Sequence, residues 1–180
     1  MKMLMTVSLF LVSGLALASE NHGDHSKMNH SKMDHSKMDH SKHGKENKEF
    51  NMVLKGYERL HQAFFDNDNA KVQKQAAEVA KSIDGIKDEK ISKTLGFAKK
   101  KLNEIASSSD FEANKTSFGT VSHALLIVLE KHSMNKGYGG YYCPMVKKYW
   151  IQNTAKSKKV MNPYASSSMP ECGSPKKIGS

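Results

Sequence analysis

Apolar residues recur with a helical period through the middle of the chain, from about residue 47 to residue 132. Four stripes show the three- and four-residue spacing that places side chains on one face of an α-helix. The stripes consist of Phe50, Val53, Leu54, Tyr57, Leu60, His61 and Phe64; of Val72, Ala76, Val79, Ala80 and Ile83; of Ile91, Leu95, Ala98, Leu102 and Ile105; and of Phe118, Val121, Leu125, Val128 and Leu129. No strand-like alternation of any length accompanies them. Four amphipathic helices with short connections predict an all-α fold, an up-down four-helix bundle.

Polar residues between the stripes predict where the helices begin and end. The sequence Asp66-Asn67-Asp68-Asn69 is typical of a turn and supplies an N-cap for the second helix. Gly85 is expected to end that helix, and Asp88 to cap the third. Ser109 and Glu112 have the spacing of a capping box, which predicts the start of the fourth helix.

The chain changes character after about Ser133. This part contains all four prolines, both cysteines and the only tryptophan. We expect a short helix from Pro144 to about Thr154 and loops elsewhere, held against the bundle by side chains. The folded domain is therefore expected to span residues 47–175, with a loop-rich C-terminal lobe and a short tail at 176–180.

The first residues have the pattern of a secretory signal peptide. Lys2 provides a positive start, Leu4 to Leu17 is apolar but too short to span a bilayer, and Ala16-Leu17-Ala18 is a typical cleavage site. Residues 1–18 are therefore expected to be removed. No later stretch is apolar enough for a membrane span, so we expect an exported protein without stable membrane insertion. In a bacterium with two membranes, that location is the periplasm.

Residues 19–46 form a polar segment with a five-residue repeat of histidine and methionine. It has no apolar periodicity and no aromatic residue, so it is expected to remain a disordered tail. The candidate metal ligands in this tail are His22, His25, Met28, His30, Met33, His35, Met38, His40 and His43.

Imidazole and thioether together favour copper or silver. Thioether suits Cu(I) and Ag(I), and imidazole also suits Cu(II). We expect several interchangeable sites in the tail whose affinity falls on acidification. If cleavage fell after Ser19, the new terminus Glu20-Asn21-His22 would offer a square-planar Cu(II) site. A spacer expanded by replication slippage is the alternative, although a spacer has no need of methionine.

A second candidate site lies in the C-terminal lobe. Cys143-Pro144-Met145 and Met169-x-x-Cys172 each place a thiol near a thioether. Two thiolates and two thioethers could bind one Cu(I) ion if the two segments meet. A disulfide between Cys143 and Cys172 is the competing interpretation, and the two states could alternate with redox conditions.

The same segments resemble a known family. The series Cys143-Pro144-Met145, Trp150, Asn162-Pro163-Tyr164, Met169 and Cys172-Gly173 resembles DUF3347, a domain found in exported bacterial proteins and attached to CusB-like periplasmic adaptors of heavy-metal efflux systems. The resemblance extends over about residues 47–173 and includes Tyr57, Leu60, Ala63 and the acidic turn of the first helix. Ala165-Ser166 departs from it, because the family tends to have Gly after Asn-Pro-Tyr. The resemblance implies a helical bundle and a link to copper or silver handling.

Charge and motifs argue against two other classes of function. The net charge is +10, and nine lysines against one acid lie from Lys131 onward. Such a basic end could bind an anionic membrane surface or a nucleic acid. Nucleic-acid binding usually depends on arginine side chains, however, and Arg59 is the only arginine in the chain. No nucleophile motif is present, so we expect no enzyme activity.

Three histidines of the expected bundle, His61, His123 and His132, lie outside both candidate metal sites. His61 lies on an apolar face and is expected to be a hydrogen-bonded core residue. His123 is expected at the surface or beneath the C-terminal lobe. His132, with Met134, could add ligands at the end of the fourth helix.

The sequence thus predicts a periplasmic copper- or silver-binding protein that captures, buffers or passes on metal ions. A heavy-metal efflux adaptor or a cuproprotein would be its partner. The alternative is a disulfide-stapled interaction module of an efflux or envelope system, with no metal site in the folded domain. A third interpretation is an envelope thiol–disulfide protein, which would need an unusually oxidising and accessible cysteine pair.

Overall fold

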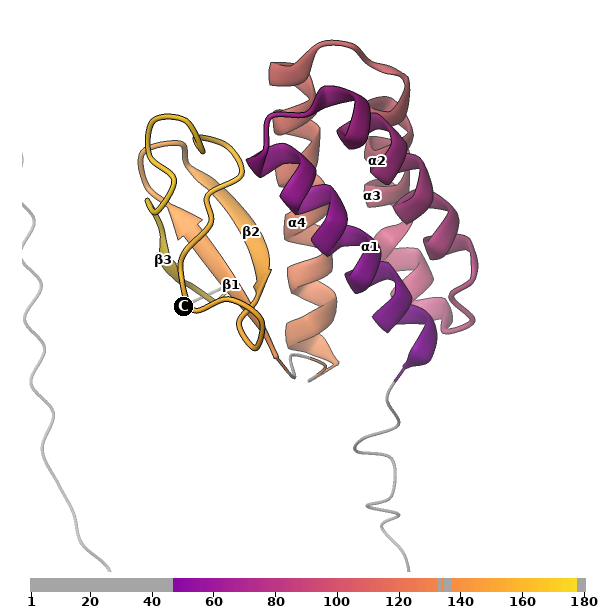
Figure 1. The fold of residues 1–180 in the computed structure, drawn as a ribbon. Coiled ribbons are helices and arrows are strands. Elements are labelled where there is room, and N and C mark those ends of the chain that lie inside the picture. Colours follow the sequence, from indigo (N-terminus) through magenta and orange to yellow (C-terminus); the bar gives the residue numbers. More distant parts are fainter. Residues whose placement is uncertain (1–46, 133, 135–136, 178–180) are drawn as a thin grey trace, which may run out of the picture. The chain divides into compact units, whose positions relative to one another are not determined.

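The computed structural model describes residues 47–132, 134 and 137–177. The expected signal peptide, the His/Met tail and residues 178–180 lie outside the described residues. The helices are α1 (Lys48–Phe65), α2 (Asn69–Asp84), α3 (Glu89–Ser107) and α4 (Phe111–Lys131), and the strands are β1 (Tyr138–Cys143), β2 (Lys148–Asn153) and β3 (Ser174–Pro175). Figure 1 shows the helices packed together, with the strands beside α4.

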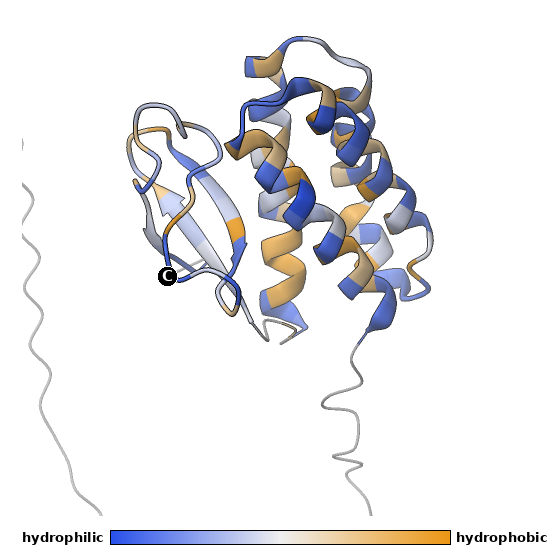
Figure 2. Cartoon of the chain, in the orientation of Figure 1, coloured by the Kyte–Doolittle hydropathy of each residue, from blue (hydrophilic) through white to orange (hydrophobic). Residues whose placement is uncertain are grey.

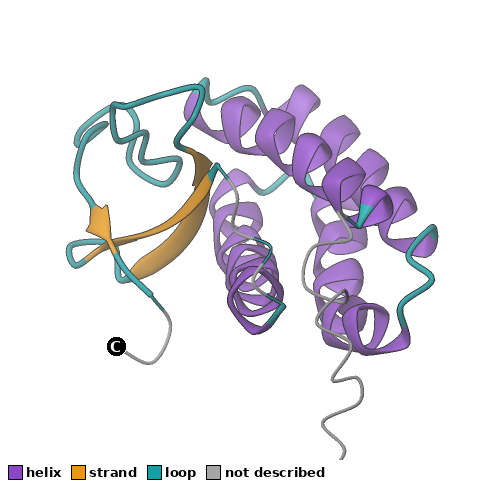
Figure 3. Ribbon diagram, turned by 90° about the horizontal axis from the view of Figure 1, so that it is seen from below, coloured by secondary structure: helices purple, strands orange, loops and turns teal. Residues whose placement is uncertain are grey.

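Consecutive helices pack against one another, α1 on α2, α2 on α3 and α3 on α4. The predicted stripes form the buried core, and nearly all of their side chains are less than 5% exposed. The helical core is thus confirmed. β2 packs against α4, and Figures 1 and 3 show the sheet on the side of α4 away from α2 and α3. The lower turns of α4 are strongly hydrophobic in Figure 2, as expected for a helix covered on two sides.

Each helix begins at a residue whose side chain accepts a hydrogen bond from the first turn. The N-caps are Asn47, Asp68, Asp88 and Asp110. The predictions for Asp68, Asp88 and the end of α2 at Gly85 are confirmed. The capping box at Ser109 is wrong by one residue, because the Asp110 carboxylate accepts from the backbone N–H groups of Glu112 and Ala113.

The predicted helix from Pro144 to Thr154 is wrong. β1 and β2 form an antiparallel hairpin in which Cys143 faces Lys148 and Tyr141 faces Trp150. β3 adds to the other edge of β1, giving the order β2-β1-β3. The aromatic pair Tyr141 and Trp150 stacks at 5.6 Å between ring centroids. Such cross-strand aromatic contacts stabilise a hairpin, so the all-α prediction fails for the lobe.

Buried hydroxyl groups fasten the hairpin to the bundle. The Tyr57 hydroxyl of α1 accepts the Ile151 backbone N–H at 3.1 Å and shares a hydrogen bond with Ser122 of α4 at 2.8 Å. Ser122 also lies 3.4 Å from the Tyr164 hydroxyl, which donates to the Tyr149 carbonyl at 2.6 Å. Because burial desolvates the phenol, the pKa of Tyr57 is raised above its usual range. Two helices, a strand and a loop therefore meet in one hydrogen-bonded network.

Two further contacts from α1 hold the lobe in place. His61 is 5% exposed, and its Nε2 lies 2.9 Å from the Met161 carbonyl oxygen, so the prediction of a hydrogen-bonded core histidine is confirmed. Glu58 receives hydrogen bonds from Tyr138, Asn153 and Lys156. The lobe is thus attached by polar as well as apolar contacts. None of the helices in the described part of the chain is both long and apolar enough to cross a bilayer.

Candidate metal centre

The hairpin fixes the position of the first thiol. Cys143 is the last residue of β1 and is 0% exposed. Residues 144–147 form the hairpin loop, in which Lys147 has a left-handed conformation (φ 53°). This loop directs the backbone N–H groups of Met145 and Val146 toward the Cys143 sulfur. The sulfur therefore sits in a rigid setting with hydrogen-bond donors already in place.

A compact loop brings the second thiol to the first. Met169 N–H donates to the Ala165 carbonyl at 2.7 Å, and Cys172 N–H donates to the Met169 carbonyl at 3.1 Å. The adjacent Gly173 lies against the Trp150 ring, and a Cβ atom at this position would overlap the ring. As a result the Cys172 sulfur lies 2.7 Å from the Cys143 sulfur. The structure thus places the two sulfurs side by side, an arrangement that suits either a dithiol or a disulfide.

Asn162 joins the two halves of this site. It is 0% exposed, and its side-chain amide donates to the Cys172 carbonyl at 3.0 Å while its carbonyl oxygen accepts the Tyr164 N–H at 3.0 Å. The same amide also hydrogen-bonds to the Cys143 sulfur. In the sequence, Asn162 stood out only as part of the Asn162-Pro163-Tyr164 series that resembles DUF3347. Because this buried side chain contacts both the loop that carries Cys172 and the Cys143 sulfur, Asn162 positions the two thiols. The Asn-Pro-Tyr sequence was the only signal for this role.

The surroundings make the two thiols unequal. Burial alone would raise the pKa of the Cys143 thiol, but the hydrogen bonds to its sulfur outweigh burial and lower that pKa. The hydrogen bond to Cys143, together with burial and the neighbouring negative charge, raises the pKa of the Cys172 thiol. The pair therefore favours a Cys143 thiolate that accepts the Cys172 proton. Cys172 is the partly exposed member, so it is the one that solvent can reach.

The two candidate thioethers lie at the margin of the thiol pair. The Met145 backbone reaches the sulfurs, but its side chain is 69% exposed and points into solvent. Met169 is partly exposed and is joined to Cys172 by the turn described above. The structure thus brings the two thiols together, with one thioether in the same turn and the other at the hairpin tip.

The other candidate ligands do not join this site. The His123 ring is exposed and stacks on Tyr149 at 5.8 Å, while Met134 is packed against the core. Within residues 47–132, 134 and 137–177, no three His, Cys, Asp or Glu side chains are grouped so as to hold a metal ion. His22, His25, Met28, His30, Met33, His35, Met38, His40 and His43 lie outside the described residues.

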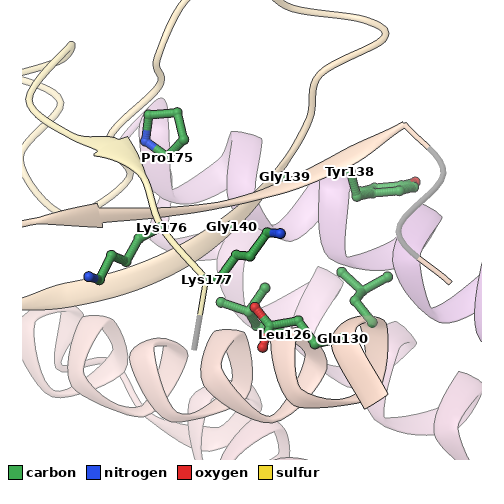
Figure 4. A pocket seen from close by; sticks show the side chains of 9 residues that line it. Leu126, Glu130, Tyr138, Gly139, Gly140, Pro175, Lys176 and Lys177 are labelled. Carbon is green, nitrogen blue, oxygen red and sulfur yellow. The ribbon is translucent and has the colours of Figure 1, made fainter. Parts of the chain in front are cut away.

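A separate cavity of about 520 Å³ opens between α4 and the edge of the sheet (Figure 4). It is lined by Leu126, Leu129 and Glu130 of α4, by Tyr138, Gly139 and Gly140 of β1, and by Pro175, Lys176 and Lys177. None of these residues supplies a soft donor atom. The cavity therefore belongs to the junction of lobe and bundle and not to the thiol site.

Comparison with known proteins adds no relative. No family model, no curated protein and no solved structure matches the chain. The resemblance to DUF3347 therefore stays a prediction that depends on the residues quoted above.

Proposed function

We propose that the protein binds soft metal ions, Cu(I) in the first place and Ag(I) as its analogue, and that the folded domain contributes one site at Cys143 and Cys172. The observation that carries the proposal is the convergence of the two thiols from separate segments to 2.7 Å. Thiolate is the protein ligand that soft ions prefer, and thioether is next to it in softness.

Binding at this site requires a small opening of the pair. With metal–sulfur bonds of about 2.3 Å, two thiolates on one ion lie about 3.8 Å apart or more. Cys143 lies within the sheet, so the movement falls on the Cys172 side, where turns precede Cys172 and the two-residue strand β3 begins at Ser174. Met169, three residues before Cys172 in the same turn, is the third candidate donor. Met145 at the hairpin tip is the fourth candidate donor.

The His/Met tail supplies the capture step in this proposal. Its repeated imidazoles and thioethers would hold Cu(I), Cu(II) or Ag(I) in several exchanging sites, and the domain would keep one Cu(I) ion in a more selective site. Export to the periplasm, through a cleaved signal peptide, would place the protein where a heavy-metal efflux adaptor or a cuproprotein could receive the ion. Ligand exchange between soft donors needs no enzyme activity.

A Cu(I) titration against a chromophoric competing chelator tests the proposal. It is run on the reduced full-length chain and on a truncated chain that begins at Lys45. We expect the truncated chain to retain one equivalent of chelator-resistant Cu(I), and the Cys143→Ser/Cys172→Ser variant of it to retain none. The full-length chain is expected to bind further equivalents.

Methionine variants provide the matched control. Met145→Leu and Met169→Leu in the truncated chain are compared with Met52→Leu, because Met52 is also exposed (64%) but lies on α1. Weakened binding in Met169→Leu with no change in Met52→Leu would place thioether in the site. If the truncated chain binds no Cu(I), the metal site in the domain is refuted, and the disulfide-stapled interaction module becomes the better description.

A further inference from the structure

The two thiols differ in access in a way that suits a second kind of chemistry. The Cys143 sulfur is fully enclosed, whereas Cys172 is partly exposed, and the sulfurs lie 2.7 Å apart. Thiol–disulfide exchange requires one sulfur that an outside disulfide can reach and a second sulfur behind it. Only Cys172 meets the first requirement, and only Cys143 is placed for the second.

We propose that Cys143 and Cys172 form a thiol–disulfide exchange pair that reduces an external disulfide, with Cys172 as the attacking sulfur and Cys143 as the resolving sulfur. The activity goes beyond metal binding and needs no metal ion. The substrate class is a disulfide small or exposed enough to approach the Cys172 loop.

The reaction balances within the pair and its substrate. Both sulfurs start as thiols. The Cys172 thiol gives its proton to water, and the resulting thiolate attacks the disulfide, forms a mixed disulfide and expels one substrate thiolate, which takes a proton from water. The Cys143 thiol then loses its proton in the same way, and its thiolate attacks the Cys172 sulfur, forms the Cys143–Cys172 bond and expels the second substrate thiolate. Two electrons pass from the pair to the substrate, and the reverse sequence restores the dithiol from a partner dithiol.

The polar groups around Cys143 support its proposed role in the forward reaction and in the reverse reaction. The backbone N–H groups of Met145 and Val146 and the side chain of Asn162 lie near its sulfur and act to lower its pKa. Such donors stabilise a thiolate, which is the attacking form in the resolving step and the leaving group in the reverse reaction. They belong to a hairpin loop and a buried asparagine, so they stay in place whichever bond is formed. Asn162 acts through the sulfur and is a positioning residue.

The experiment is carried out on the full-length reduced protein, with a copper chelator and EDTA present so that metal binding plays no part. Glutathione disulfide is the probe, and products are identified by intact mass and peptide mapping after acid quench. In Cys143→Ser we expect a stable single glutathione adduct at Cys172. In Cys172→Ser the enclosed Cys143 is expected to react about tenfold more slowly or less in the folded state, and to become reactive in urea.

The wild-type chain gives the second measurement and does not depend on any variant folding. It is expected to reach the intramolecular disulfide without accumulating an adduct, and any adduct trapped early should lie on the Cys172 peptide. A trapped adduct on Cys143, equal rates in the two variants, or failure of the wild type to form the disulfide would each overturn the assignment. Loss of Cu(I) binding alone leaves these results unchanged, so the two proposals fail separately.

Discussion

Acid should weaken the attachment of α1 to the C-terminal lobe through His61. The ring is enclosed between α1 and the lobe, and its Nε2–H donates to the Met161 carbonyl. Burial lowers the pKa of His61 from 6.5 to about 4, even though the hydrogen bond to Met161 and the Glu58 charge act in the opposite direction. The folded protein therefore keeps the ring neutral at pH values where the unfolded chain binds a proton.

The sign and size follow from proton linkage. The unfolded state binds more protons between pH 6.5 and about 4, so the free energy of unfolding falls as the pH falls through that window. With a pKa of 6.5 unfolded and about 4 folded, lowering the pH from 7 to 5 costs about 2 kcal/mol. The loss levels off below about pH 4, at about 3 kcal/mol, because each pKa unit corresponds to 1.36 kcal/mol.

His61→Gln is the matched comparison, because a glutamine amide can donate near the Nε2 position and does not titrate. Urea unfolding is followed at pH 7 and pH 5 by the fluorescence of Trp150, the only tryptophan and a fully buried one. The wild type should lose about 2 kcal/mol more than His61→Gln between the two pH values. Carboxylates contribute equally to both chains and cancel. Parallel losses in the two chains, or a His61 pKa near 6.5 by NMR titration, would refute the reasoning.

Three other substitutions test the contacts around the site by the same urea unfolding measurement. Gly173→Ala places a methyl group into the Trp150 ring; it should lower stability by about 1–3 kcal/mol and, by displacing the loop, speed alkylation of its thiol. Tyr57→Phe leaves the buried Ile151 N–H without its acceptor, which should cost about 1–3 kcal/mol, and an unchanged stability would show that water replaces the hydroxyl. Glu58→Gln removes the charge that collects hydrogen bonds from β1, β2 and the following turn; a loss of about 1–2 kcal/mol at pH 7 is expected, and no loss would mean that the ion pair is not needed.

The helices could be predicted because their information is local. A stripe such as Val72, Ala76, Val79, Ala80 and Ile83 shows its period within one helix, and its N-cap Asp68 adjoins it. The error at Ser109 arose because two polar residues in a row could each accept from the first turn, and the carboxylate of Asp110 is the better placed acceptor.

The hairpin could not be predicted in the same way. Tyr141 and Cys143 are enclosed, and Trp150, Ile151 and Gln152 are buried in succession. β1 begins with a glycine pair flanked by tyrosines, and β2 has three buried residues in a row, so neither strand shows the apolar–polar alternation of a half-buried strand in its sequence. Their pairing depends on residues across the hairpin and on α4, and neither is visible in a local window.

The proximity of the two thiols could be predicted from the sequence, but their difference in solvent exposure could not. Two Cys-containing segments with nearby methionines suggested convergence, and the structure brings the sulfurs to 2.7 Å. Which sulfur is enclosed depends on the strand that ends at Cys143 and on Asn162, whose role arises only when the loop folds over the sheet.

The two proposals make different demands on the same pair of thiols. Cys143 is part of the sheet, and the sheet is fastened to two helices through Tyr57 and Ser122, so its sulfur is fixed. Cys172 belongs to a segment of short turns that is held by Asn162, by the close contact of Gly173 with the Trp150 ring and by the pairing of the following strand β3 with β1. A metal ion needs the sulfurs further apart and a disulfide needs them closer, and both changes are available by moving the same loop. Because a disulfide consumes both thiolates, the two states exclude each other, and oxidation of the pair would release a bound ion.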